Sequence, residues 1–265
     1  MGAFVHHVDL ADILSSPDLL REIRRLAVQY EVLFFRDQHA EPAVLQAFAE
    51  TFGEILDHLA YPTIADAPNV QILESTPENP SKIEMWHSDM TFSATPPSFT
   101  ILHGKIIPEF GGDTLWASAT AAYAALSSQL QNFLDGLTAV HDFRHGFAES
   151  LAEPGGPERL ANAIAANPPV EHPLVRTHPE TGKTALFVNR LFTTRIKQLS
   201  AHESRSVLEF LYQHIVTEEF TVRLNWQPDT VAIWDNRSTQ HKPVNDYFPQ
   251  ARRLHRVTIK GDTPR

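Results

Sequence analysis

The chain has 265 residues, of which 42% are hydrophobic and 20% charged, proportions typical of a globular protein with a sizeable core. It contains no cysteine, which excludes disulfides, Cys-rich zinc sites, iron–sulfur clusters and thiol nucleophiles. Its formal net charge of −10 argues against nucleic acid as a partner, because nucleic-acid binding relies on a basic surface.

The N-terminal residues 1–14 contain no basic region followed by an apolar stretch, which is the pattern of a secretory signal. No apolar run is long enough to span a membrane. We therefore expect a cytoplasmic protein that does not associate with membranes. If its substrate is a small anion, a local cluster of arginine and histidine must attract it, because the net charge opposes its approach.

The first third of the chain predicts two helices around a short strand. Apolar residues recur at helical spacing over residues 16–30 and again over residues 42–53. Between them, residues 31–38 (EVLFFRDQ) form a short apolar run that predicts a buried strand. Residues 54–82 are rich in Pro, Asn, Asp and Ser, and they predict loops around one strand at residues 70–75.

The rest of the chain predicts further helices and strands. Residues 111–126 (GGDTLWASATAAYAAL) end in an Ala-rich stretch that predicts a helix, and residues 128–137 predict another. Residues 172–189 predict two strands around a turn at 180–183. Residues 199–216 predict a helix with a serine N-cap, and the C-terminal segments after it predict strands joined by a turn and a loop.

Residues 144–169 contain GGP and NPP and predict a long, partly ordered insertion. The sequence leaves open whether this insertion is an ordered lid or a mobile one that closes on substrate. No internal repeat, low-complexity tract or linker divides the chain, so we expect a single domain over residues 1–265. Short strands with helices packed outside them predict a β-sandwich or a barrel.

The stretch MWHSDMTF at residues 85–92 places His87 and Asp89 among apolar and aromatic residues. In a strand both side chains would point to one face, as two neighbouring metal ligands do. A third ligand would complete the 2-His-1-carboxylate triad of non-haem Fe(II) oxygenases. The spacing alone is weak evidence, because it recurs at His7/Asp9, His39/Glu41 and His178/Glu180. Only His87 and Asp89 lie in a run that should be buried, where a carboxylate needs a cation or hydrogen-bond donors.

The C-terminal stretch RRLHRVTIKG predicts a strand in which Arg252 and Arg256 share a face with Leu254. Two arginines on one strand face suggest an anion pocket, because guanidinium groups match carboxylate and sulfo oxygens. The alternative is a solvated edge strand with a basic face. His241 lies eleven residues before Arg252, a spacing that decides nothing by itself.

Taken together, these segments closely resemble the taurine dioxygenase branch of the Fe(II)/2-oxoglutarate-dependent dioxygenases. The resemblance rests on WHSDMTF, GGDTLWAS, VAIWDNRSTQH and RRLHRVTIKGD, with shorter matches at FFRDQ, HDFR, HPLVRTHPETGK, LFVN and FTTRI. It covers nearly the whole chain. It implies a mainly β fold with flanking helices, the double-stranded β-helix or jelly roll.

The resemblance also implies a role for individual residues around the metal. His87, Asp89 and His241 match the three iron ligands of the family. Thr114 and Arg252 match the residues that hold the distal carboxylate of the co-substrate 2-oxoglutarate. In this family Fe(II), 2-oxoglutarate and O2 act together.

A second group of residues matches the substrate pocket. Arg256 matches the arginine that binds the sulfonate of the primary substrate, and His58 matches the histidine that assists it. Tyr61, Phe147 and Phe192 fall where the family lines this pocket.

The implied reaction converts 2-oxoglutarate and O2 to succinate and CO2 while hydroxylating the substrate carbon next to sulfur. The hydroxylated sulfonate then collapses to an aldehyde and sulfite. Asp89 favours hydroxylation, because related halogenases carry a small residue at this position. Relatives commonly form homodimers or homotetramers, so either assembly is expected.

The identity of the substrate stays open at this point. Taurine-specific members carry Asp and Asn before the WH pair, where this chain has Lys82 and Ile83, which are poor partners for an ammonium group. We therefore expect the preferred substrate to be a small sulfonate, either taurine itself or a related alkanesulfonate that has no amino group. Two alternatives remain: an alkylsulfatase that acts on alkyl sulfate esters, and a non-catalytic metal-binding jelly-roll protein.

Overall fold

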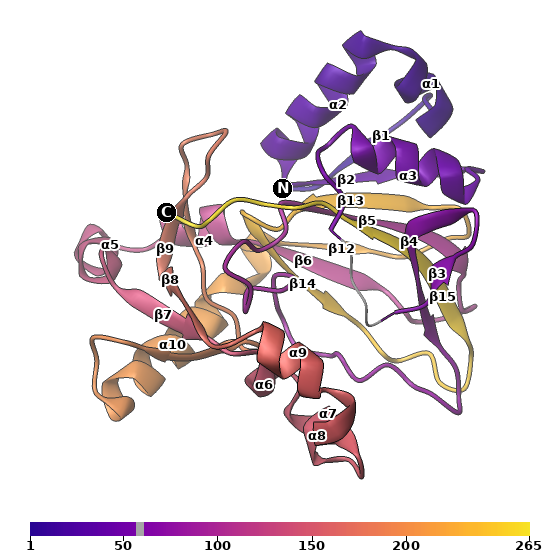
Figure 1. Ribbon diagram of the computed structural model, residues 1–265. Helices are drawn as coiled ribbons and strands as arrows, with labels where there is room; N and C mark the ends of the chain where they lie inside the picture. The colour runs from indigo at the N-terminus through magenta and orange to yellow at the C-terminus, as the bar shows by residue number, and fades with distance from the viewer. Residues whose placement is uncertain (57–60) are drawn as a thin grey trace.

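The computed structural model describes residues 1–56 and 61–265. Its largest layer is a seven-stranded sheet with the strand order β1-β2-β13-β5-β15-β4-β3 (Figure 1). In that order the strands are β1 (Ala3–Val5), β2 (Val32–Phe35), β13 (Val231–Asp235), β5 (Phe99–Ile106), β15 (Arg252–Thr258), β4 (Ala67–Ser75) and β3 (Thr63–Ile64). Apart from the parallel pair β1 and β2, the neighbouring strands of this sheet are antiparallel.

Three smaller sheets accompany this layer in the described residues. They are β12-β6-β14, with β12 (Thr221–Leu224), β6 (Thr114–Ser118) and β14 (Thr239–Pro243); β11-β7-β8, with β11 (Thr193–Ile196), β7 (Thr138–His141) and β8 (Val170–Pro173); and β10-β9, with β10 (Thr184–Leu186) and β9 (Val175–Thr177). Trp116 of β6 and Leu224 of β12 belong to the same core cluster as residues of the seven-stranded sheet. The sheet β12-β6-β14 therefore faces the seven-stranded sheet, and the two enclose this cluster.

The alternation of side chains along β2 explains why its sequence is apolar at every position. Val32 and Phe34 point into the core between the two sheets, whereas Leu33 and Phe35 point to the opposite face. All four side chains are buried. The apolar run at 31–38 was predicted to be a buried strand, and this prediction is confirmed.

Helices cover the outer face of the seven-stranded sheet, as the indigo end of the chain in Figure 1 shows. They are α1 (Leu10–Ser15), α2 (Pro17–Tyr30) and α3 (Pro42–Glu50). The side chain of Ser16 accepts a hydrogen bond from the Leu19 amide and so caps α2, as the Ser-Pro start predicts. The two predicted helices are confirmed, although α3 ends at Glu50 rather than at Gly53.

A second group of helices packs around the smaller sheets. It contains α4 (Ala119–Ala124), α5 (Ser128–Leu134) and α10 (Ala201–Ile215), with the short 3-10 helix η1 (Glu218–Phe220) after α10. The start of α10 is a capping box in which Ser200 and Glu203 each bond the other's backbone amide, so the predicted N-cap is confirmed. The predicted strand pair around the turn at 180–183 is also confirmed, since β9 and β10 form an antiparallel hairpin.

The insertion predicted at residues 144–169 is a run of short helices rather than a partly ordered loop. These are α6 (Phe143–Gly146), α7 (Ala148–Ala152), α8 (Gly156–Arg159) and α9 (Ala161–Ala166), at the bottom of Figure 1. Apolar side chains of this run, including Phe147, Leu160 and Ile164, pack on a buried cluster that contains Phe92 and Phe192. This packing holds the insertion against the rest of the molecule. The prediction of a mainly β protein with flanking helices is confirmed, and within the described ranges no helix is both long and apolar enough to cross a bilayer.

The core between the two sheets predicts a measurable contribution to stability. Phe34 is 2% exposed and its ring lies 5.4 Å from the ring of Trp116. Phe34→Ala should lower the free energy of unfolding by about 3–5 kcal/mol, because it removes a buried aromatic side chain and leaves a cavity. Chemical denaturation measures this loss. Phe133→Ala is the control, because Phe133 is 47% exposed, and its substitution should cost no more than about 0.5 kcal/mol.

Candidate metal centre and anion pockets

His87, Asp89 and His241 converge in the structure although they lie far apart in the sequence. One potential ligand atom from each lies within 4.8 Å of the others. The Oδ1 atom of Asp89 lies 3.8 Å from Nε2 of His87 and 3.9 Å from Nε2 of His241. All three side chains are buried. The three residues selected from the sequence therefore form a group that can hold a metal ion.

A backbone bridge brings the two histidines together. The amide of His87 donates to the carbonyl of His241 at 3.0 Å, and the amide of His241 donates to the carbonyl of His87 at 2.7 Å. His241 lies on β14, and His87 forms only this isolated bridge with it. The backbone pairing of this segment with β14 is thus confined to His87, and the hydroxyl of Ser88 adds a hydrogen bond to the carbonyl of Thr239 on the same strand.

The prediction that His87 and Asp89 share the face of a strand is wrong. The chain turns at Asp89, and Met90 has a φ of 47°, in the left-handed region. The turn closes with a hydrogen bond from the Ser93 amide to the Met90 carbonyl. Asp89 therefore reaches the histidines from a turn, because the strand pairing of this segment stops after His87.

The protonation of the three side chains suits a divalent metal. Nδ1 of His87 lies 2.8 Å from the Met85 carbonyl, which can only accept, so Nε2 is left free to bind a metal. Burial lowers the pKa of His87, and burial together with His87 lowers the pKa of His241 to about 3. Burial raises the pKa of Asp89, but His241, Arg256 and His87 outweigh it and the pKa is lowered. Two neutral imidazoles and one carboxylate are the donor set of non-haem Fe(II) sites, and the residues present fit that metal.

Arg252 and Thr114 form a candidate anion pocket. Nη2 of Arg252 lies 3.5 Å from Oγ1 of Thr114, which accepts a hydrogen bond from Nε1 of Trp226 at 2.9 Å. The guanidinium lies 5.7 Å from the Trp226 ring centroid, and burial lowers the pKa of Arg252 to about 10. Within the described residues no carboxylate forms an ion pair with Arg252, and its buried Nε has no hydrogen-bond partner. A partly buried guanidinium beside a hydroxyl group can bind a carboxylate.

The register of β6 and β14 relates this pocket to the metal ligands. Trp116 of β6 pairs with His241, and Thr114 pairs with Pro243. Thr114 therefore lies two residues along β6 from Trp116, the residue that faces His241. Two residues of a strand correspond to roughly 7 Å. A short dicarboxylate can extend from a metal at His241 to Thr114.

Gly112 explains the GGD sequence that precedes Thr114. Its φ is +72°, and a Cβ atom there would lie 2.9 Å from Cγ of Pro108 and 3.3 Å from Cδ of Arg252. Glycine thus permits both the left-handed backbone and the close approach of this loop to Arg252.

Arg256 provides a second cationic group near the candidate metal ligands. Its Nε and Nη2 atoms donate to Oε1 of Gln71 at 2.9 and 2.8 Å, and its guanidinium lies 4.7 Å from the ring centroid of Tyr61. Its charge influences the pKa of Asp89 and lowers the pKa of both histidine ligands. Gln71 was not selected from the sequence, because only its pairing with Arg256 across β4 and β15 reveals it. His58 lies outside the described residues.

Phe192 and Phe147 belong to an aromatic cluster next to His87. The buried members of this cluster are Phe92, Phe143, Leu191 and Phe192, and Ile83, Met90, Phe147, Leu160, Ala163 and Ile164 pack against them. The ring centroid of Phe192 lies 6.4 Å from that of His87, whereas Phe147 stacks on Phe143 at 4.3 Å. Phe192 is therefore a member of this cluster whose ring approaches His87, and Phe147 packs near Phe192 from the helical insertion.

Lys82 and Ile83, which depart from the taurine-type pattern, lie in different surroundings. Ile83 packs against the aromatic cluster. The ammonium of Lys82 forms an ion pair with Glu153, which also pairs with Arg159 at 2.8 Å. The cation of Lys82 is thus neutralised by the helical insertion, and the side chain next to it is apolar.

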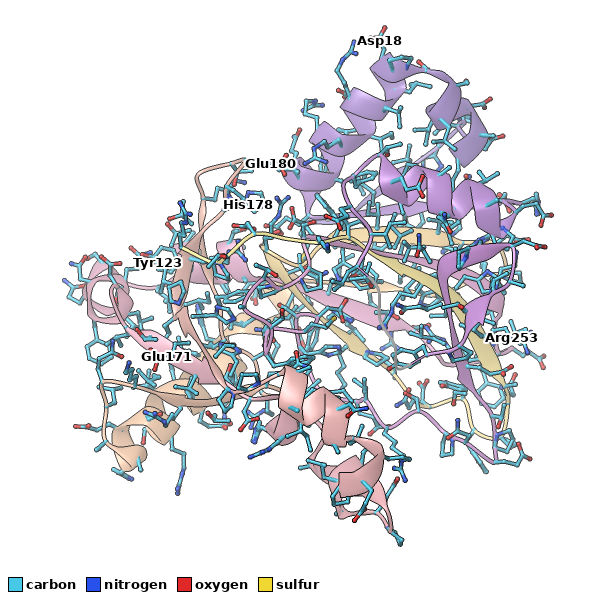
Figure 2. The ribbon with its side chains drawn as sticks, in the orientation of Figure 1. Asp18, Tyr123, Glu171, His178, Glu180 and Arg253 are labelled. Carbon is cyan, nitrogen blue, oxygen red and sulfur yellow. The ribbon has the colours of Figure 1, made fainter. Side chains whose placement is uncertain are left out.

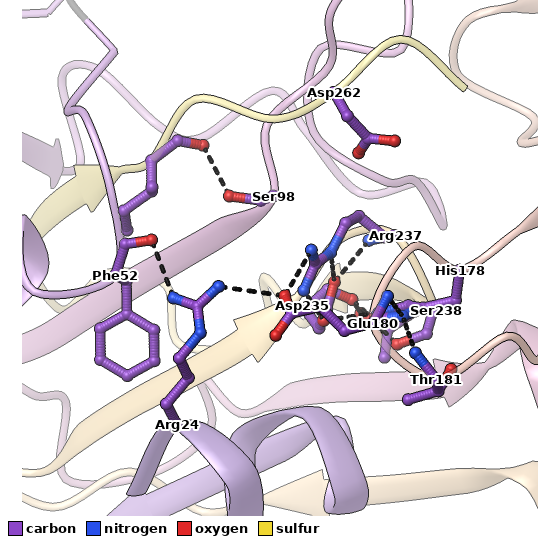
Figure 3. A network of polar contacts seen from close by, with 12 residues as sticks. Arg24, Phe52, Ser98, His178, Glu180, Thr181, Asp235, Arg237, Ser238 and Asp262 are labelled. Carbon is purple, nitrogen blue, oxygen red and sulfur yellow. Dashed lines mark hydrogen bonds and ion pairs between the residues drawn. The ribbon is translucent and has the colours of Figure 1, made fainter. Parts of the chain in front are cut away.

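A buried ion-pair network holds the turn that leads into His241 (Figure 3). Asp235 accepts hydrogen bonds from Nε and Nη2 of Arg237 at 2.8 and 2.6 Å, and its Oδ2 lies 3.0 Å from Nε2 of His178. Burial raises the pKa of Asp235, but Arg237 and His178 lower it to about 2. Arg237 also pairs with Glu180, which pairs with Arg24 of α2. The network joins the β13–β14 turn to α2 and to the β9–β10 hairpin.

Ion pairs with other residues account for two of the other His–acid pairs in the sequence. His178 and Glu180 lie on the β9–β10 hairpin, where Figure 2 labels them, and both belong to the ion-pair network. His39 pairs with Asp229 at 2.9 Å and not with Glu41 through any described ion pair. Neither pair belongs to a group that could hold a metal among the described residues.

Two described cavities lie away from the metal ligands. The larger, of about 780 Å³, is lined by residues that include Glu31, Thr120 and Tyr123. The smaller, of about 260 Å³, is lined by residues that include Trp86 and Tyr212. No metal ligand lines either cavity, so the candidate site is defined by its converging side chains.

The model of the taurine catabolism dioxygenase TauD, TfdA family matches residues 1–258. The chain belongs to this family. It is 37% identical to an alkylsulfatase of Acinetobacter baylyi over 99% of the chain and 83% of that protein. It is 35% identical to an α-ketoglutarate-dependent sulfate ester dioxygenase of Pseudomonas putida, over 100% of the chain and 88% of that protein. It is 32% identical to an α-ketoglutarate-dependent sulfonate dioxygenase of Saccharomyces cerevisiae, over 100% of the chain and 66% of that protein.

Solved structures of related proteins share the whole fold. A taurine dioxygenase from Burkholderia xenovorans superimposes with a TM-score of 0.84 at 36% identity, over 100% of this chain and 87% of that one. The protein AAD-2 in complex with Mn(II) and N-oxalylglycine superimposes with a TM-score of 0.82 at 27% identity, over 99% of this chain and 94% of that one. The predicted double-stranded β-helix is confirmed, with sheets that do not close into a barrel. The protein is a 2-oxoglutarate-dependent dioxygenase that uses Fe(II), 2-oxoglutarate and O2.

His87→Ala should abolish Fe(II) binding, because it removes one of the three converging donors. Anaerobic addition of Fe(II) and 2-oxoglutarate to the unsubstituted protein should give a weak visible absorption band, which the variant should lack. His202→Ala is the control, because His202 is an exposed residue of α10, and it should keep the band. A full-strength band in His87→Ala would contradict the metal assignment.

Arg252→Ala should raise the KM for 2-oxoglutarate at least ~30-fold, because it removes the partly buried cation that we expect to pair with the co-substrate carboxylate. Succinate formation at varied 2-oxoglutarate concentrations measures this change. Arg253→Ala is the matched control. Arg253, labelled in Figure 2, is the next residue of β15 and pairs with Glu74 with its side chain 41% exposed. An equal effect of the two substitutions would contradict a specific role of Arg252.

Proposed function

We propose that this enzyme hydroxylates the carbon next to sulfur in a small sulfonate and thereby releases sulfite and an aldehyde, with succinate and CO2 formed from 2-oxoglutarate. The observation that carries the proposal is the position of Arg256. Its guanidinium is held by Gln71 and Tyr61, and its charge acts on all three candidate metal ligands. A sulfonate bound there would have its neighbouring carbon directed toward the metal.

In this proposal His87, Asp89 and His241 hold the iron. When bound, the iron and 2-oxoglutarate supply the oxidising chemistry, whereas the protein binds and orients the reactants. Arg252 and Thr114 bind the distal carboxylate of 2-oxoglutarate and so orient its other end toward the metal.

The substrate is positioned by a second set of residues. Arg256 binds the sulfonate, together with His58, which lies outside the described residues. Tyr61 stacks on Arg256, and Phe192 and Phe147 belong to the aromatic cluster that lines the pocket and excludes water. Exclusion of water protects the oxidising centre from side reactions.

We propose further that the preferred sulfonate carries no amino group, although taurine remains a candidate. An ammonium group needs an acidic or carbonyl partner. Here Ile83 packs in the aromatic cluster, and Lys82 pairs with Glu153, which is also engaged by Arg159. This apolar wall supports an alkanesulfonate.

A second candidate is the oxidation of alkyl sulfate esters, which would release sulfate and an aldehyde. Two relatives, at 37% and 35% identity, are an alkylsulfatase and a sulfate ester dioxygenase. The same arginine can bind a sulfate ester, because each head group presents three equivalent oxygens that share one negative charge. The sulfonate dioxygenase of yeast and the taurine dioxygenase structure support the sulfonate reaction.

We also propose that residues 1–265 form one catalytic domain, which acts in the cytoplasm as a homodimer or homotetramer. The net charge of −10 supports the absence of a nucleic-acid partner. We propose a small anion as the binding partner of the site, because Arg252 and Arg256 provide local positive charge there.

A panel of potential substrates tests the proposal. Sulfite release should be faster with short alkanesulfonates and isethionate than with taurine, because the pocket lacks a partner for the ammonium group. Succinate formation with each compound measures productive turnover, and sulfate release from alkyl sulfates measures the second candidate reaction. A strong preference for taurine would contradict the proposed pocket chemistry, and iron binding without any turnover would favour the non-catalytic alternative.

A further inference from the structure

The two carboxylate oxygens of Asp89 have different surroundings. Oδ1 faces the Nε2 atoms of both histidine ligands, at 3.8 and 3.9 Å. Oδ2 lies 2.6 Å from Oγ1 of Thr100 on β5. One oxygen is therefore available to a metal, and the other is held by the protein.

The direction of the hydrogen bonds around Thr100 follows from the chemistry of Asn236. The indole N–H of Trp234 and the backbone N–H of Asp89 can only donate, and both reach Oδ1 of Asn236, at 3.0 and 3.3 Å. The NH2 group of Asn236 must then point to Oγ1 of Thr100, which lies 2.9 Å away. Because its oxygen already accepts this bond, Thr100 is oriented to donate its own hydrogen to Asp89.

The chain of donors is built on rigid, buried elements. Thr100, Asn236 and Trp234 are 0%, 2% and 1% exposed. Trp234 of β13 and Thr100 of β5 are direct register partners in the seven-stranded sheet. The ring of Trp234 also packs on the ring of His241, with the centroids 4.7 Å apart. Side chains fixed in this way keep the groups that they bond in one geometry.

We propose that Thr100 and Asn236 are positioning residues that hold Asp89 as a one-oxygen ligand, with Oδ1 directed to the metal and Oδ2 held by Thr100. The inference rests on the proposed metal role of His87, Asp89 and His241. A carboxylate that is prevented from binding through both oxygens leaves more coordination positions for 2-oxoglutarate and O2. Partners of this kind typically contribute about 10- to 100-fold to metal affinity or activity.

Thr100→Val tests the proposal, because valine has nearly the shape of threonine but no hydroxyl group. We expect Mn(II) to bind about 10- to 100-fold more weakly to this variant, measured as free Mn(II) by electron paramagnetic resonance in the absence of substrates. The visible spectrum of the Co(II)-loaded protein should also change, because the released carboxylate can bind through both oxygens. Thr100→Ser keeps the hydroxyl group and should restore both the affinity and the spectrum.

Thr100→Ala keeps the test informative if the valine variant does not fold, because it lacks the same hydroxyl group in a smaller side chain. Thr230→Val is the matched control for the loss of a buried hydroxyl. Thr230 is 0% exposed and its Oγ1 accepts from Nη1 of Arg36 at 2.8 Å, so its loss should leave Mn(II) affinity unchanged.

Two outcomes separate the inference from the proposed function. If His87→Ala loses Mn(II) binding but Thr100→Val and Thr100→Ala keep the affinity and the Co(II) spectrum of the unsubstituted protein, the positioning role is overturned and the metal centre stands. If His87→Ala also binds Mn(II) normally, the metal centre itself is wrong, and the inference fails with it.

Discussion

The charge of Asp89 in the protein interior is the constraint around which the rest of the site is arranged. Asp89 is only 8% exposed, and its carboxylate lies near residues of both main sheets, Thr100 of β5 and His241 of β14. A buried carboxylate without partners costs several kcal/mol, so it must be compensated. Thr100 donates to one oxygen, Arg256 provides a nearby positive charge, and the other oxygen faces the two histidines. A divalent cation bound at that point would complete the compensation.

This constraint couples the site to the packing of the two sheets. Thr100 and Arg256 belong to the seven-stranded sheet, whereas His241 belongs to the sheet β12-β6-β14. The core cluster between these sheets contains Trp234 and Trp116, whose rings lie 5.6 Å apart. The candidate metal ligands and their partners therefore come together only when this core is packed, so the stability of the core and the integrity of the site depend on the same contacts.

Local sequence patterns predicted the regular elements but not the geometry of the site. Ser16 and Ser200 mark the N-termini of α2 and α10 in the sequence, because helix caps and apolar periodicity are local properties. The segment at Asp89 was predicted to be a strand but is a turn, with Met90 in the left-handed region. The Asp89 amide bonds to the side chain of Asn236, which is 147 residues away, and a local pattern does not reveal such a contact. The ligands were found through the family resemblance and not through spacing, because equally spaced pairs serve elsewhere. Gln71 and Trp226 were missed for the same reason as the turn: each acquires its role from a side chain on another strand.

The two arginines of β15 divide the recognition of anions into two separate positions. Arg252 and Arg256 are four residues apart on the strand, which corresponds to roughly 13 Å. Arg252 faces Thr114 and Trp226, whereas Arg256 faces Gln71 and Tyr61, so each cation has its own polar and aromatic neighbours. Under the proposed function these positions hold the co-substrate and the sulfonate, and neither anion can displace the other without losing matched contacts.

Since the chain as a whole carries a charge of −10, both anions depend on these local cations rather than on the overall field. Under the same proposal, discrimination among sulfonates falls to the apolar aromatic cluster, which would contact the part of the substrate that the arginines do not reach.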